Sequence, residues 1–135
     1  MAISKREYLQ TLIQTSKDGK FPSVRPKQDC IVARCLYRTN DGRACAFGLL
    51  IPDNRYCANM EEFSSSRIIE KYKLQDVIPE GLDHNDIREI QRVHDKHALD
   101  STETQVIPWK HKSFVNALLS LGCFAEFAGD KSLVA

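Results

Sequence analysis

Apolar residues recur at the spacing of a helix near the start of the chain. The apolar positions of this first stripe are Tyr8, Leu9, Leu12 and Ile13. Ser4 stands three residues before Glu7, as in a capping box, where each side chain accepts a hydrogen bond from the backbone N–H of the other residue. Gly19 follows the stripe, and glycine commonly ends helices. The pattern predicts a helix from about residue 5 to residue 17.

The same period predicts three further helices. Residues 64–73 form a short amphipathic segment that begins with three serines, a residue type that caps helices. Asp83 or Asn85 is placed to begin a third helix, and residues 109–121 form a fourth. The inward positions of the third helix are Ile87, Ile90, His94 and His97. Its other faces carry Arg88, Glu89, Arg92 and Lys96.

A different pattern separates the first two helices. Residues 30–37 are rich in β-branched, aromatic and cysteine side chains, and residues 39–42 (Thr-Asn-Asp-Gly) have strong turn chemistry. The returning segment 43–51 is apolar without a clear period; we expect a strand to about Ala46 and then a short helix, which Pro52 ends. These residues predict a small β-hairpin.

The elements together predict an α+β fold: one globular domain over residues 1–135, mainly helical with about four helices, and one small β-hairpin. A chain of this length buries roughly two-thirds of the surface that its unfolded form exposes, which is enough for one core. The apolar run at 44–51 is therefore interpreted as part of that core.

Composition excludes several classes of protein. Nineteen basic residues face 18 acidic ones, so the chain lacks the basic excess typical of nucleic-acid binding. The apolar run at 44–51 is far shorter than a membrane span, and the N-terminal residues do not resemble a secretory signal. A cytoplasmic location is expected, with no membrane partner. The five cysteines are then expected to be free thiols.

Two blocks of the sequence resemble a family of small uncharacterised accessory proteins from phages and bacteria. The first block consists of Tyr37, Arg38, Gly42, Cys45, Ala46, Gly48, Leu50, Ile51, Pro52, Asp53 and Tyr56. The second consists of His84, Asn85, Ile90, Gln91, His94, Asp95 and Trp109. The resemblance covers about residues 35–121 and implies an accessory protein that modulates a host protein. It brings no established activity and no catalytic or binding residues.

One candidate chemistry is a thiol nucleophile. Cys45 would attack, His94 would act as its base, and Asp53 or Asp95 would orient the imidazole. Such a cysteine needs a lowered pKa, supplied by an imidazolium or a helix N-terminus. Between alanines and Phe47, however, Cys45 is more simply a small buried side chain. The cysteine-dependent enzyme is therefore kept as the alternative function.

A metal site is a second candidate. His94 and His97 share one face of the third predicted helix, and Cys30, Cys35, Cys45 and Cys57 could supply thiolates for zinc. Structural zinc ligands usually come in pairs only a few residues apart, whereas four, nine and eleven residues separate these cysteines. No metal and no cofactor are expected.

The third candidate is recognition without chemistry. Arginine and tyrosine are enriched at interfaces, and they bracket the apolar run. The candidate binding residues are Tyr37, Arg38, Arg43, Arg55 and Tyr56. Arg38 and Arg43 flank the predicted turn and could clamp a phosphate or a carboxylate. The sequence favours a non-catalytic binding protein, with a protein partner favoured over a small anionic ligand.

Overall fold

The computed structural model describes residues 3–25, 34–39, 42–100 and 105–133. Its α-helices are α1 (Lys5–Lys17), α2 (Ser65–Lys71), α3 (His84–Ala98) and α4 (His111–Leu119). Short 3₁₀ helices are η2 (Gly48–Leu50), η3 (Ala58–Glu62), η4 (Gln75–Val77), η5 (Gly122–Phe127) and η6 (Lys131–Leu133). Extended structure comprises β1 (Val24–Arg25) and β2 (Arg34–Cys35).

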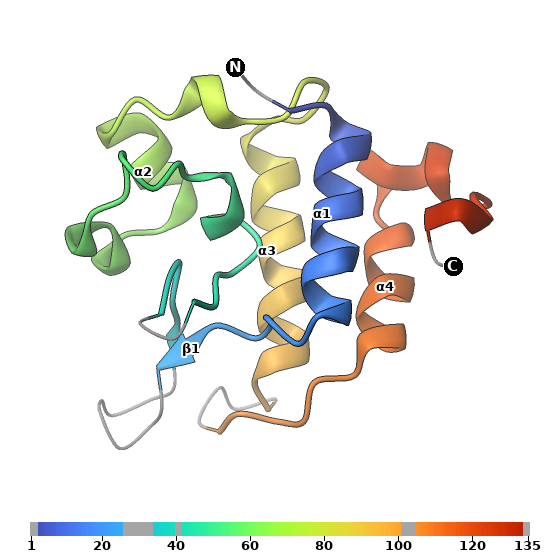
Figure 1. Ribbon diagram of the computed structural model, residues 1–135. Helices are drawn as coiled ribbons and strands as arrows, with labels where there is room; N and C mark the ends of the chain where they lie inside the picture. Colours follow the sequence, from blue (N-terminus) through green and yellow to red (C-terminus); the bar gives the residue numbers. More distant parts are fainter. Residues whose placement is uncertain (1–2, 26–33, 40–41, 101–104, 134–135) are drawn as a thin grey trace.

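Three of the α-helices stand side by side (Figure 1). Helices α1 and α3 run in the same direction and α4 runs in the opposite one, packed against both. Helix α2 packs against α3, on the other side of α3 from α4 in this view. The described residues between α1 and α2, which we call the irregular segment, include η2 and η3 and few residues of regular structure. The segment passes through the lower left of the molecule in Figure 1 and links α1 to α2.

Local chemistry explains where α1 and α3 begin. Ser4 Oγ accepts the Glu7 N–H at 3.1 Å, and a Glu7 carboxylate oxygen accepts the Ser4 N–H at 3.3 Å. Asp83 and Asp86 exchange the equivalent pair of bonds at the start of α3, at 2.9 and 3.0 Å. These side chains satisfy N–H groups that the first helical turn leaves without partners. The capping box predicted from the sequence for α1 is confirmed.

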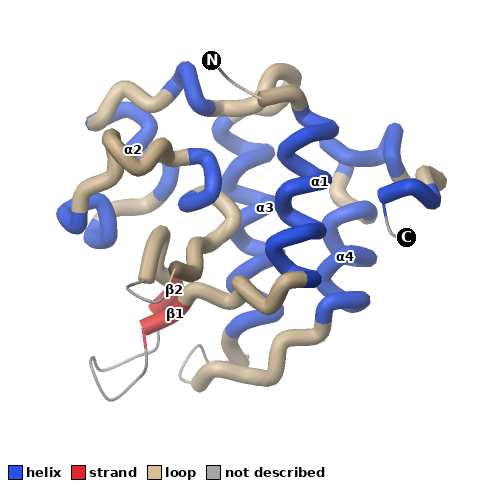
Figure 2. The backbone as a smooth tube through the Cα atoms, in the orientation of Figure 1, coloured by secondary structure: helices blue, strands red, loops and turns tan. Residues whose placement is uncertain are grey.

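The prediction of a mainly helical chain agrees with the described residues, but the α+β class with a hairpin across the turn at residues 39–42 is wrong. Strand β2 pairs antiparallel with β1, not with the segment after the turn (Figure 2). Across the turn only one bridge forms, between Arg38 and Ala44. The returning segment cannot extend that pairing, since it turns into η2 at Gly48. Residues 30–33 of the predicted strand and 40–41 of the turn lie outside the described residues.

The core lies between the helices and the irregular segment. The interpretation of the apolar run as core is confirmed by its buried members, which are Cys45, Ala46, Phe47, Gly48, Leu50 and Ile51. The largest fully buried side chains from elsewhere include Tyr8, Met60, Phe114 and Phe124. Burying one large apolar side chain stabilises a fold by about 1.5–3 kcal/mol, so this shared core fastens the irregular segment to the helices.

Of the helices described, none combines the length and the apolar character needed to cross a lipid bilayer.

Gly48 allows two backbone segments to approach closely. A Cβ atom at this position would lie 1.9 Å from the carbonyl oxygen of Tyr37. That oxygen also accepts the Cys45 N–H at 3.2 Å, so it is held in place. Only glycine fits here without moving the backbone.

We expect Gly48→Ala to lower the free energy of unfolding by about 1–3 kcal/mol or more, because the added methyl group overlaps a fixed carbonyl oxygen. Urea denaturation measures the change. Gly129→Ala is the matched control. A Cβ atom at residue 129 meets no atom within 4 Å, so the free energy of unfolding should change by less than about 0.5 kcal/mol. If the two variants have the same free energy of unfolding, Gly48 does not lie this close to the Tyr37 carbonyl.

Candidate functional site

The Cys45 thiol lies in the core below η2. The residue is 1% exposed, and its Sγ accepts the Gly48 N–H at 3.3 Å. Burial raises the pKa of the thiol to about 12, and the negative charges of Asp95 and Glu61 act in the same direction. The Gly48 amide opposes this shift but does not overcome it. Cys45 is therefore a protonated thiol at neutral pH, whereas a nucleophile needs a thiolate.

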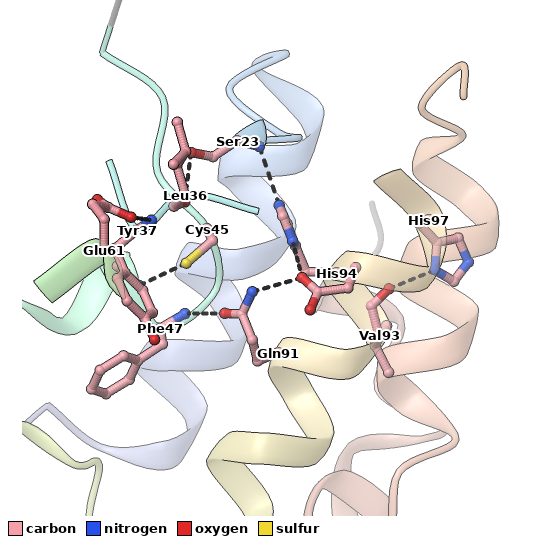
Figure 3. Close-up of polar contacts among 12 residues, drawn as sticks. Ser23, Leu36, Tyr37, Cys45, Phe47, Glu61, Gln91, Val93, His94 and His97 are labelled. Atoms are coloured by element: carbon pink, nitrogen blue, oxygen red, sulfur yellow. Dashed lines mark hydrogen bonds and ion pairs between the residues drawn. The ribbon is translucent and has the colours of Figure 1, made fainter. Parts of the chain in front are cut away.

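Both ring nitrogens of His94 have partners (Figure 3). Nε2 accepts the Ser23 N–H at 3.3 Å, which places the proton of the neutral ring on Nδ1. Nδ1 lies 3.0 Å from a carboxylate oxygen of Asp95. The buried ring also packs against Phe21 and Trp109, with centroids 5.2 and 5.6 Å away. Of the two carboxylates considered for orienting this imidazole, the structure brings Asp95 to it and not Asp53.

Gln91 links the irregular segment to Asp95. Its side-chain oxygen accepts the Phe47 N–H at 3.0 Å, and its side-chain amide donates to Asp95 at 2.8 Å (Figure 3). Sequence reasoning assigned Gln91 no role. The spacing of four between Gln91 and Asp95, which places both on one helix face, was the signal that could have found it.

The Glu61 carboxylate accepts hydrogen bonds from three of the candidate residues. It accepts the N–H groups of Tyr37 at 2.8 Å and Arg38 at 3.1 Å, and the Tyr56 hydroxyl at 2.5 Å. Burial, together with the Glu61 carboxylate, raises the pKa of Tyr56. Glu61 was also missed, because its partners lie up to 24 residues away in the sequence and no local pattern marks them.

The Arg38 guanidinium points back onto the protein. It donates to the Asp53 carboxylate and to the Ile51 carbonyl, and lies over the Tyr56 ring at 5.3 Å from its centroid. Asp53 is thus the ion-pair partner of Arg38, on the surface. Its side chain is 93% exposed, so this pair is of the kind that stabilises a protein only weakly.

The other two candidate arginines have different partners. Arg43 donates to the carbonyl of Pro22 at 3.2 Å, beside β1. Arg55 donates to the Asp76 carboxylate at 2.7 Å and to the Lys73 carbonyl at 2.9 Å. Arg38 and Arg43 flank the turn as expected, but their guanidinium groups reach separate partners and do not converge on one anion.

The metal candidates do not converge in the described part of the chain, where no group of three metal-binding side chains is found. His97 Nδ1 lies 2.8 Å from the Val93 carbonyl and His94 has the partners given above. Cys57 is a half-buried free thiol. Cys30 lies outside the described residues, as does the side chain of Cys35.

A groove of about 530 Å³ lies between α3 and the segment that leads into α2. The α3 wall carries Arg88, Gln91, Arg92, Asp95 and Lys96. The opposite wall carries Glu61, Phe63, Ser64, Ser65 and Ser66. Tyr37 and Cys45, both buried, contribute to its base. Its volume is that of a site for a small molecule or a short peptide segment.

Comparisons of the chain with protein-family models, with curated proteins and with solved structures gave no match. The resemblance to phage and bacterial accessory proteins stays a prediction.

We expect Cys45 to resist alkylation in the folded protein. A pKa of about 12 leaves about one thiol in ten thousand ionised at pH 8, and the sulfur is covered. Treatment with iodoacetamide between pH 6 and 9, followed by peptide mass spectrometry, should show the Cys45 peptide unmodified until urea is added. Rapid native modification of Cys45 below pH 7 would support the enzyme alternative instead.

We expect Glu61→Gln to lower the free energy of unfolding by about 1–3 kcal/mol, since an amide presents a donor where the carboxylate accepts three hydrogen bonds. Glu70→Gln, on the exposed face of α2, is the control and should be nearly neutral. Urea denaturation measures both. If the two variants lose the same stability, the carboxylate does not anchor this segment.

Proposed function

We propose that the protein acts by binding a partner protein, and that the groove between α3 and residues 61–66 is its recognition site. The observation that carries this proposal is the chemistry of the groove lining. Charged and hydroxyl side chains form its walls, and buried residues form its base. Sites that recognise ligands commonly pair an apolar interior with a few polar groups that fix orientation.

The partners of the five candidate residues support placing recognition in the groove. Tyr37 lines it, whereas the guanidinium groups of Arg38, Arg43 and Arg55 already donate to groups of the chain. Releasing them for a ligand would cost the hydrogen bonds that they make now. The cations of the groove wall reach solvent instead.

A binding role also accords with the state of Cys45. An enzyme of the thiol class needs a thiolate beside a general base, while here the thiol is protonated and the His94 nitrogens face Ser23 and Asp95. Modulation of a host protein, as the sequence resemblance implies, is the context we propose for this binding.

Site-specific photocrosslinking tests the proposal. Benzoylphenylalanine replaces Ser66 on the groove wall in one variant and Ser113 on α4 in the other; both residues lie in the first turn of a helix. Irradiation in cells that naturally produce the protein should yield a discrete protein adduct from position 66 and none from position 113. Equal adducts from both positions, or none from either, would contradict recognition through the groove.

A further inference from the structure

We propose that the occupant of the groove is an extended acidic segment of the partner protein, with carboxylates at alternate residues bound along α3. This inference rests on the proposed function and adds the chemistry of the ligand. Three features carry it: the cations of the α3 wall, their spacing, and the excess of cations over carboxylates in the groove lining.

Three cations line the α3 wall on one face of the helix. Arg88, Arg92 and Lys96 follow one another at intervals of four residues, and all three are exposed. Arg88 donates to Asn85 at 2.8 Å, and Arg92 pairs with Glu89 only at 3.4 Å, between side chains that are 62% and 47% exposed. An ion pair this exposed is weak, and the Arg88–Asn85 bond lies on the surface, so an acidic ligand can replace both at little cost.

The lining of the groove keeps an excess of positive charge. Asp95 accepts hydrogen bonds from the side chains of Gln91 and His94. Glu61 accepts from two backbone N–H groups and from the Tyr56 hydroxyl. These donors are neutral, so both carboxylates keep their charge, but their bonded oxygens face the chain while the three cations extend into solvent. Three cations against two carboxylates leave the groove lining with a positive balance, and its solvent-facing groups on α3 are mainly basic.

The spacing selects an extended peptide. From residue 88 to residue 96 the helix rises about 12 Å, with one cation about every 6 Å. Side chains on one face of an extended chain recur about every 6.8 Å, so three alternate residues span about 13.6 Å. Acidic side chains at alternate positions thus match the three cations nearly one to one. Consecutive acidic residues would send every second carboxylate away from α3.

The opposite wall meets the intervening side chains of such a segment, because successive side chains of an extended chain point to opposite faces. Ser66 lies on this wall, and Phe63 adds an apolar side chain. A hydroxyl both donates and accepts, so small polar side chains between the acidic ones fit this wall.

Fluorescence anisotropy with labelled synthetic peptides tests this inference. The probe is Gly-Asp-Thr-Asp-Thr-Asp-Gly; one control peptide has asparagine in place of each aspartate, and another has the three aspartates in a row. We expect the alternating peptide to bind, the consecutive one to bind several-fold more weakly, and the asparagine one not to bind. Binding should weaken from 0.1 to 1 M salt, as the screening length falls from about 10 to about 3 Å.

Paired variants locate the site. Arg92→Gln with Lys96→Gln should weaken binding of the alternating peptide about tenfold, since two ion pairs are lost. Lys20→Gln with Lys112→Gln removes the same charge from exposed positions outside the groove and should leave binding unchanged. All four positions are exposed, and the melting temperature of each double variant confirms that it folds.

Several results would overturn the inference. Two of them are the same loss of binding in both double variants and a consecutive peptide that binds as tightly as the alternating one. Inorganic phosphate or a single-stranded oligonucleotide that binds more tightly than the alternating peptide would also overturn it. Concentration-dependent dimerisation that excludes the peptide would assign the groove to a second copy of this chain. If no peptide binds while the crosslinker at position 66 still captures a protein, the groove remains the recognition site and the acidic segment is wrong.

Discussion

The fold depends on side-chain acceptors that satisfy the backbone of its irregular segment. The described residues between α1 and α2 contribute many side chains to the core, yet few of them belong to a β-ladder, so their buried N–H groups need other partners. Helix α3 and η3 supply them. The pairs are Ser23 with His94, Phe47 with Gln91, and Tyr37 and Arg38 with Glu61. Without these acceptors the buried amides would oppose docking of the segment onto the helices.

This constraint also explains the positions of the residues considered for catalysis. Asp95 contacts His94, and Asp95 and Cys45 both line the groove. Each of these side chains supports the backbone directly or orients another side chain that does. Cys45 accepts the Gly48 N–H, and His94 accepts the Ser23 N–H. Asp95 orients the side chains of His94 and Gln91. These hydrogen bonds require the neutral tautomer of His94 that carries its proton on Nδ1.

Sequence reasoning predicted the parts of the fold that local chemistry determines. The start of α1 could be predicted because Ser4 and Glu7 lie three residues apart and cap each other. The irregular segment could not, since its amides pair with side chains far along the chain, as Phe47 does with Gln91 across 44 positions. The hairpin was wrongly predicted for the same reason: turn chemistry shows where the chain can reverse, not which strand it then meets.

Trp109 lies where the irregular segment packs against the helices. Its ring lies 5.5 Å from that of Phe21 in the irregular segment and 5.6 Å from that of His94 on α3, while its Nε1 donates to Ser16 Oγ on α1 at 2.9 Å. The chain contains a single tryptophan, so its emission is an intrinsic optical probe of this junction. Undocking of the irregular segment would remove Phe21 from that ring and change the emission before the helices themselves unwind.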